Sequence, residues 1–167
     1  MSVAEHKSKA PIAVPCFVLT VSDTRTAETD TSGRAIRALL EGAGHQVTGG
    51  AIVRDDPDAV TRAIRDQVTG GPTRIVIATG GTGITSRDGT FEAVDRLFDK
   101  RLDGFGELFR MLSFDEIGPA AMLTRATAGT IGRHAVFVLP GSENAVRLAM
   151  TRLILPELGH VVQQLDR

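Results

Sequence analysis

The stretch RIVIATGGTGITSRDGT, residues 74–90, contains the pattern that decides the fold and its candidate site. Residues 74–79 form a continuous apolar, β-branched run, typical of a strand buried on both faces of a parallel sheet. Three glycines follow within residues 80–83, and a single acid, Asp88, comes five residues after them. Because glycine permits positive φ and carries no side chain, such a turn can gather backbone N–H groups into an anion-binding nest. Read in isolation, an ordinary glycine-rich turn is the simpler interpretation.

Three further runs share this apolar character, at residues 13–21, 51–53 (starting near Val47) and 134–139. Helical periodicity fills the chain between and after the runs, over residues 32–44, 56–68, 90–98, 104–118, 119–129, 144–154 and 157–165. Pro156 is expected to break the last of these patterns. The alternation of strands and helices predicts an α/β fold: a three-layer α/β/α sandwich around a mostly parallel sheet with right-handed crossovers.

Some details of these elements are also predicted. Ser32 or Thr31 is expected to cap the first helix. The segment 90–133 is too long for one crossover, so it holds either an extra helix pair or a short edge strand. One face of the 104–118 helix indicates core packing, with a subunit interface as the alternative, and it carries Phe105, Leu108, Phe109 and Leu112.

Composition limits the classes of function. The 167 residues are 42% hydrophobic and 23% charged, with a net charge of −1, no Trp and no Tyr, so nucleic acid is not an expected partner. No apolar stretch reaches the roughly 18 residues that a membrane span needs, and the start lacks the apolar segment of a secretory signal. We therefore expect a cytoplasmic protein with no membrane partner, a flexible tail over residues 1–12 and a single domain over 13–167.

Polar segments follow all four strands. They are SDTR (22–25), RDD (54–56), TGGTG (79–83) and PGSEN (140–144). Because the carboxyl ends of parallel strands meet at one edge of a sheet, where open α/β sheets bind ligands, we expect these four loops to lie together. This inference depends only on the strand assignment.

The chemistry of this edge points to phosphate and a metal ion. The turn is neither a P-loop nor a GxGxxG motif, and no lysine lies nearby, so Mg²⁺ held by carboxylates is the natural source of positive charge. Four acids are placed for this: Asp23, Asp55, Asp56 and Asp88. Each has a simpler reading, since Asp56 can cap the helix that begins at Pro57, Asp88 can cap the helix at residue 90, and the other two can be solvated loop acids.

Taken in order, SDTR, TGGTGITSRDGT, GFGELFRMLSFDEIG and LPGSENAV closely resemble the MogA/MoaB family of molybdenum cofactor biosynthesis over roughly residues 14–160. The resemblance implies a molybdopterin adenylyltransferase that uses Mg²⁺ and ATP. Such an enzyme moves AMP from ATP to the terminal phosphate of molybdopterin and releases pyrophosphate. It also implies a homotrimer or homohexamer and, as a further partner, a molybdate-inserting protein.

The family's functional positions map onto this chain residue by residue. Its catalytic, metal-binding carboxylates correspond to Asp56 and Asp88, with Asp55 as the adjacent possibility. Its ligand-binding loops correspond to Ser22, Asp23, Thr79, Gly80, Gly81, Thr82, Gly83, Pro140, Gly141 and Ser142. Ser113, which can also be a helix cap, and Arg125 are assigned to the pterin side. Thr124 departs from the family, because many relatives carry serine there.

Two other functions are considered. A catalytically silent molybdopterin-binding or assembly protein could lose the acid pair after the second strand, and the pair is intact here. A nucleotide-binding oxidoreductase lacks its glycine fingerprint. The sequence therefore favours the enzyme.

Overall fold

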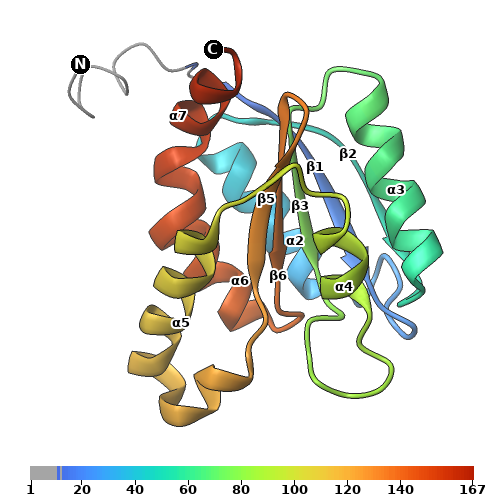
Figure 1. Ribbon diagram of the computed structural model, residues 1–167, viewed down its shortest axis with the longest axis vertical. Coiled ribbons are helices and arrows are strands. Elements are labelled where there is room, and N and C mark those ends of the chain that lie inside the picture. The colour runs from blue at the N-terminus through green and yellow to red at the C-terminus, as the bar shows by residue number, and fades with distance from the viewer. Residues whose placement is uncertain (1–10, 12) are drawn as a thin grey trace.

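The computed structural model describes Pro11 and residues 13–167, so the predicted tail over residues 1–12 lies almost entirely outside the described residues. Six strands form one sheet in the order β2-β1-β3-β6-β5-β4 (Figure 1). Their bounds are β1 Pro15–Val21, β2 Gln46–Val53, β3 Ile75–Thr79, β4 Lys100–Arg101, β5 Thr127–Ile131 and β6 His134–Leu139. The four strands expected from the sequence pair in parallel, whereas β5 is antiparallel to β6 and β4 to β5.

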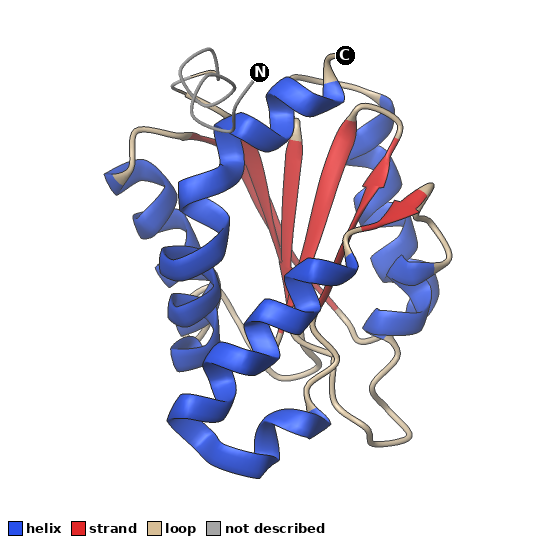
Figure 2. Cartoon of the chain, turned by 60° about the vertical axis from the view of Figure 1, so that its left-hand side comes forward, coloured by secondary structure: helices blue, strands red, loops and turns tan. Residues whose placement is uncertain are grey.

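Helices cover both faces of this sheet (Figure 2). They are α2 Thr31–Gly42, α3 Pro57–Thr69, α4 Thr90–Asp95, α5 Asp103–Ile117, α6 Glu143–Ala149 and α7 Leu155–Leu165. A 3₁₀ segment, η1 Gly118–Leu123, follows α5, and a π-helical segment, η2 Met150–Ile154, joins α6 to α7. The predicted three-layer α/β/α sandwich around a mostly parallel sheet is confirmed.

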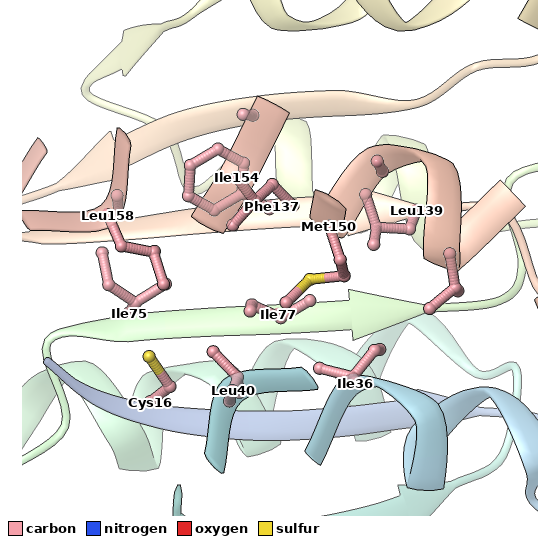
Figure 3. Packing of buried hydrophobic residues seen from close by; sticks show 14 of the residues in the cluster. Cys16, Ile36, Leu40, Ile75, Ile77, Phe137, Leu139, Met150, Ile154 and Leu158 are labelled. Carbon is pink, nitrogen blue, oxygen red and sulfur yellow. The ribbon is translucent and has the colours of Figure 1, made fainter. Parts of the chain in front are cut away.

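The period of two along each strand divides the core between the two faces. On β3, Ile75 and Ile77 point to the layer formed by α2, α5 and the C-terminal helices, whereas Val76 and Ala78 point to α3 and α4. Figure 3 shows the first layer in detail: side chains from the helices meet those of β1, β3 and β6, among them Ile36, Leu40, Met150, Ile154 and Leu158. Burial on both faces explains why these strands read as continuous apolar runs.

Two expectations about the elements between residues 90 and 131 are wrong in detail. Residues 119–129 do not form a helix: Gly118 ends α5 with φ 65°, η1 follows, and residues 127–131 pair with β6 as an edge strand. The backbone pairing with β6 outweighs the helix propensity of the alanines there. The helix predicted over 90–98 ends at Asp95. The short edge strand left open for residues 90–133 is therefore the correct alternative, realised as β4 and β5.

Pro156 does not break the C-terminal helix. The backbone N–H of Leu155 donates to the carbonyl of Met150, five residues earlier, so the helix widens immediately before the proline. This π-helical turn places Pro156 in the first turn of α7. At that position the N–H that proline lacks removes little of the helix's hydrogen bonding. Among the helices of the described residues, none has the length and apolarity needed to cross a membrane.

Candidate functional site

The ends of β1, β2, β3 and β6 are tied together at one edge of the sheet, which is the lower end in the view of Figure 1. The N–H of Ser22 donates to the carbonyl of Val53 at 2.9 Å, which joins the ends of β1 and β2. The N–H of Gly80 donates to the carbonyl of Leu139 at 3.0 Å, and the hydroxyl of Thr79 donates to the carbonyl of Pro140 at 2.8 Å. The four loops predicted from the strand order therefore meet.

The glycine turn after β3 (residues 80–83) has a backbone that few other residues could adopt. Gly80 and Gly81 have φ values of 105° and 67°. A Cβ atom on Gly80 would lie 2.1 Å from the carbonyl oxygen of Val21, and one on Gly81 would lie 2.0 Å from the hydroxyl oxygen of Thr90. Within residues 13–167 the N–H groups of Gly81 and Thr82 donate to no protein acceptor. The turn thus offers backbone donors that an anion can use.

Asp55 is the acid after β2 that faces this turn. Its Oδ1 accepts the N–H of Gly89 at 3.3 Å and the hydroxyl of Thr90 at 3.5 Å, and its Oδ2 lies 2.9 Å from the position of a Cβ on Gly81. Partial burial is the main cause that raises the pKa of Asp55, and the negative charges of Asp88 and Asp23 add to it. A carboxylate that is held near other carboxylates and partly desolvated is a good ligand for a divalent cation.

Asp56, assigned by resemblance to the metal, has a different place. Its Oδ1 accepts the N–H of Asp58 at 3.0 Å, so it caps α3, with Pro57 in the first helical turn. Its side chain is exposed. The structure therefore brings Asp55, the adjacent possibility, to the glycine turn and leaves Asp56 as a helix cap.

Asp88 lies beside Gly83, at the end of the turn. Its Oδ2 accepts both the N–H of Thr85 at 2.9 Å and the hydroxyl of Thr85 at 2.6 Å, and the same oxygen lies 2.6 Å from the position of a Cβ on Gly83. The hydroxyl of Thr85 is the main cause that lowers the pKa of Asp88. Asp88 is therefore an ionised carboxylate that contacts the turn through Gly83.

Asp23, after β1, links the first two loops. Its Oδ1 accepts the N–H of Asp55 at 3.2 Å, and its Oδ2 forms an ion pair with Arg87 at 2.6 Å. The hydrogen bond from Arg87 is the main cause that lowers the pKa of Asp23.

In the described part of the chain, no group of three or more His, Cys, Asp or Glu side chains is arranged to hold a metal ion. With Asp23 engaged by Arg87, an ion at this edge would have two protein carboxylates, Asp55 and Asp88, and would need ligand or water oxygens for the rest of its shell.

Arg125 holds the glycine turn through two of its backbone carbonyls, a role that sequence reasoning missed. Its Nε donates to the carbonyl of Thr82 at 3.2 Å, and its terminal nitrogens donate to the carbonyl of Gly83 and to the carboxylate of Glu92. Its guanidinium also lies 5.2 Å from the ring centroid of Phe91. Arg125 lies in the loop between η1 and β5, in a stretch first read as helix, so nothing local in the sequence pointed to this contact.

A small cavity of about 210 Å³ opens between the ends of β1, β3 and β6. Besides the predicted Ser22, Thr79, Gly80, Gly81 and Gly141, it is lined by three polar residues that sequence reasoning missed: Thr20, Asp30 and Ser32. Asp30, not Ser32 or Thr31, caps α2, since its Oδ1 accepts the N–H of Gly33 at 2.9 Å. An acid directly before a helical pattern was the available signal.

Ser113 and Ser142 line a second cavity of about 170 Å³, together with Asn144. Ser113 is buried on α5 rather than a helix cap, and Ser142 caps α6 by accepting the N–H of Ala145 at 3.3 Å. Arg125 is not part of this cavity. The two residues assigned to the pterin side therefore lie in different places.

Comparison with known proteins agrees with this architecture. Residues 17–160 match the family described as "Probable molybdopterin binding domain". Molybdenum cofactor biosynthesis protein B of Bacillus cereus is 54% identical over 168 residues, which cover 100% of this chain and 99% of that protein.

Solved structures give the same result. A crystal structure of a molybdenum cofactor biosynthesis protein B is 54% identical, has a TM-score of 0.92, and covers 95% of this chain and 99% of its own. The tungsten cofactor synthesizing protein MoaB from Pyrococcus furiosus is 40% identical with a TM-score of 0.84, covering 95% and 100%. The chain belongs to the MogA/MoaB family of molybdenum cofactor biosynthesis proteins.

Proposed function

We propose that this protein is a Mg²⁺-dependent molybdopterin adenylyltransferase, which transfers AMP from ATP to the terminal phosphate of molybdopterin and releases pyrophosphate. The observation that carries the proposal is that Asp55 lies against Gly81 and Asp88 lies against Gly83, in a glycine turn with free amide donors. The names of the relatives support a role in molybdenum cofactor biosynthesis, and the resemblance of the sequence motifs supports the reaction.

The chemistry requires positioning and charge neutralisation, not a protein nucleophile. An oxygen of the molybdopterin phosphate attacks the α-phosphorus of ATP, the bond from that phosphorus to the bridging oxygen breaks, and pyrophosphate leaves with the electron pair. The attacking phosphate oxygen already carries negative charge near neutral pH, so no general base has to remove a proton.

Each element of the edge has a defined task in this reaction. Asp55 and Asp88 would hold the Mg²⁺ ion, which neutralises charge on the phosphates. The N–H groups of Gly81 and Thr82 bind phosphate oxygens. Arg125 fixes the turn through the carbonyls of Thr82 and Gly83, so that these donors are in place before the substrate arrives.

A catalytically silent molybdopterin-binding or assembly protein is the second candidate. It is favoured by the ion pair between Asp23 and Arg87, which neutralises one of the three acids at the edge without a metal. The partly buried position of Asp55 favours the enzyme. Removing a carboxylate from water costs free energy, and an acid with no role beyond the loop would avoid this cost by remaining in solvent.

We also propose that a second copy of this chain covers the exposed face of α5 and η1. Six large apolar side chains are exposed along this surface: Leu108, Met111, Phe114, Ile117, Met122 and Leu123. Phe105 and Phe109 of the same helix pack into the core, so α5 is apolar on both sides. A contiguous apolar surface of this kind is typical of a subunit interface, in agreement with the trimer or hexamer that the resemblance implies.

Pyrophosphate release tests the proposed reaction directly. The purified protein is incubated with molybdopterin and Mg·ATP, with separate controls that omit the pterin, omit ATP or add a chelator of divalent cations. We expect pyrophosphate and adenylylated molybdopterin in equal amounts in the complete reaction alone, and none with Asp88→Asn. If the wild-type protein binds molybdopterin and forms neither product, the silent binder is correct.

A further inference from the structure

A cavity of about 350 Å³ opens at the β4 edge of the sheet, between α5 and the loop that joins η1 to β5. Three arginines from three segments line it: Arg101 of β4, Arg110 of α5 and Arg125 of the loop. Among the described residues that line the cavity, Asp103 is the only acid, so the lining has a net positive charge. We call this cavity the arginine pocket. Neither the glycine turn nor an acid of the candidate metal site lines it.

Arg110 is a half-buried cation that lacks a counter-charge. Its Nη1 donates to the carbonyls of Thr124 and Ala126 at 3.4 and 3.3 Å, which is longer than the roughly 2.7 to 3.2 Å of most N–H···O hydrogen bonds. Among the described residues, its Nε and Nη2 donate to no acceptor, and it forms no ion pair. Because a charge removed from water is costly unless it is paired, an anion in the pocket would supply what this side chain lacks.

The backbone of α5 makes room for this guanidinium. Gly106 lies one turn before Arg110, and a Cβ atom on it would lie 2.9 Å from Nη2 and 3.0 Å from Nη1 of Arg110. The same atom would lie 2.8 Å from the carbonyl oxygen of Ala126. Glycine inside a helix is less stable than alanine, so its presence here is explained by the close approach of the guanidinium.

The other two arginines have carboxylate partners. Arg101, whose side chain is 54% exposed, pairs with Asp95, and Arg125 pairs with Glu92. A guanidinium has five N–H donors in a planar fork, so Arg101 keeps donors that Asp95 does not use. All three nitrogens of Arg125 donate to the glycine turn or to Glu92. Arg125 therefore contributes charge to the pocket, and Arg101 and Arg110 contribute hydrogen bonds.

We propose that the arginine pocket binds a small oxyanion with two negative charges, the chemistry of a phosphate group, with Arg101 and Arg110 as its hydrogen-bonding ligands. The planar fork of arginine matches the oxygens of a phosphate. The volume is at the lower end of the roughly 300 to 1,000 Å³ of small-molecule sites, which suits a phosphate with little attached to it. Free phosphate and the phosphate ester of a small metabolite share this chemistry.

Calorimetric titration of the intact protein tests the proposal with inorganic phosphate and glycerol 3-phosphate, at constant ionic strength set by chloride. A chelator is present, so that phosphate binding that requires Mg²⁺ at the carboxyl edge does not contribute. Arg110→Gln keeps an amide that can donate to a carbonyl and removes the charge. We expect the anion to bind about ten- to a hundredfold more weakly, the loss of hydrogen bonds to a charged group.

A second variant should change the affinity in the opposite direction. Asp103→Asn removes the acid from the lining, so the anion should bind about two- to fivefold more tightly, the scale of one exposed charge interaction. Glu107→Gln makes the same change of charge on an exposed position of the same helix, outside the pocket, and should leave the affinity unchanged. Tighter binding in Asp103→Asn alone is a result that a purely structural role of the arginines would not give.

Two further variants keep the test sound. Arg62→Gln on an exposed position of α3 is the matched control for Arg110→Gln and should bind phosphate as the wild-type protein does. If Arg110→Gln does not fold, Arg101→Gln removes the other ligand at an exposed side chain. A threefold to tenfold loss is expected there, about that of one hydrogen bond.

The outcomes decide both the site and the source of the anion. Tighter binding of glycerol 3-phosphate than of phosphate identifies a metabolite ester, and equal or weaker binding identifies free phosphate. The proposal is overturned if neither probe binds the wild-type protein at millimolar concentration, if the arginine variants bind as tightly as wild type, or if Asp103→Asn and Glu107→Gln behave alike. It is also overturned if the protein binds no anion and Arg110→Gln dissociates an oligomer in light scattering, because a carboxylate of a second copy then fills the pocket. None of these results depends on pyrophosphate release.

Discussion

Asp55 and Gly81 face each other across the carboxyl edge of the sheet: a Cβ atom on Gly81 would lie 2.9 Å from Oδ2 of Asp55. The missing side chain lets a carboxylate from the loop after β2 approach the turn after β3. The same Cβ would lie 2.0 Å from the hydroxyl of Thr90, at the start of α4. The loop after β2, the turn after β3 and the start of α4 therefore all depend on one glycine.

Substitution of Gly81 by alanine should damage both stability and function. The new Cβ meets Asp55 and Thr90, and the φ of 67° is strained for alanine, so the free energy of unfolding should fall by about 1–3 kcal/mol. Urea denaturation measures this change. Gly104→Ala is the matched control, because a Cβ at that position in α5 meets nothing within 4 Å; it should leave stability unchanged or slightly raised. Equal stability of the two variants would contradict the described geometry.

Asp55→Asn should stabilise the metal-free protein at pH 7. Because burial raises the folded-state pKa of Asp55 above its unfolded value, the ionised form destabilises the fold above that pKa. Below the ordinary value of 3.8 the carboxyl is protonated in both states, so the advantage of the variant should disappear as the pH falls toward 4. Denaturation of both proteins at pH 7 and pH 4 in a chelator measures the difference. A variant less stable than wild type at pH 7 would show that the carboxylate is a stabilising group.

Arg125→Lys should loosen the glycine turn. Lysine has one compact ammonium group and cannot reach the carbonyls of Thr82 and Gly83 and the carboxylate of Glu92 together. We expect pyrophosphate release to fall at least about tenfold, with faster amide exchange at the turn, because misplaced positioning groups cost rates of this order. Arg147→Lys alters an exposed pair with Glu143 on α6 and serves as the control. Normal turnover in Arg125→Lys would show that the turn does not need this clamp.

Phe114→Glu should disrupt the proposed oligomer. This side chain lies on the exposed apolar face of α5, and a carboxylate there would be buried unpaired at the interface. Size-exclusion chromatography with light scattering should show an oligomer for the wild-type protein and for Arg65→Glu on exposed α3, and a monomer for Phe114→Glu. A wild-type monomer would remove the proposed interface.

The strands and their common edge could be predicted because their signals are local. Burial on both faces gives β1, β3 and β6 continuous apolar runs, and parallel pairing then fixes which ends meet. Strand β5 could not be found in this way. Its sequence, TAGTI, is rich in small residues, and only pairing with β6 makes it a strand.

The candidate site was predictable as a set of loops but not as a set of contacts. Asp55 and Asp56 are neighbours with the same side chain, and only the start of α3 at Pro57 decides that one caps the helix while the other turns to Gly81. Asp30 had a sequence signal, because it is an acid directly before a helical pattern. The helix cap was nevertheless expected at its neighbours, Thr31 or Ser32. Arg125 had none, because its partners lie about 40 residues away in the chain.

The most direct test of the account compares Asp55→Asn with Asp56→Asn in the assay of pyrophosphate release with molybdopterin and Mg·ATP. Asp55→Asn removes a carboxylate that contacts the glycine turn, so release should fall at least about a hundredfold, the usual scale for one electrostatic group at a reacting centre. Asp56→Asn keeps a residue that caps α3 equally well, so its rate should stay within about twofold of wild type. The reverse pattern, with Asp56→Asn inactive and Asp55→Asn active, would contradict the site described for this edge of the sheet.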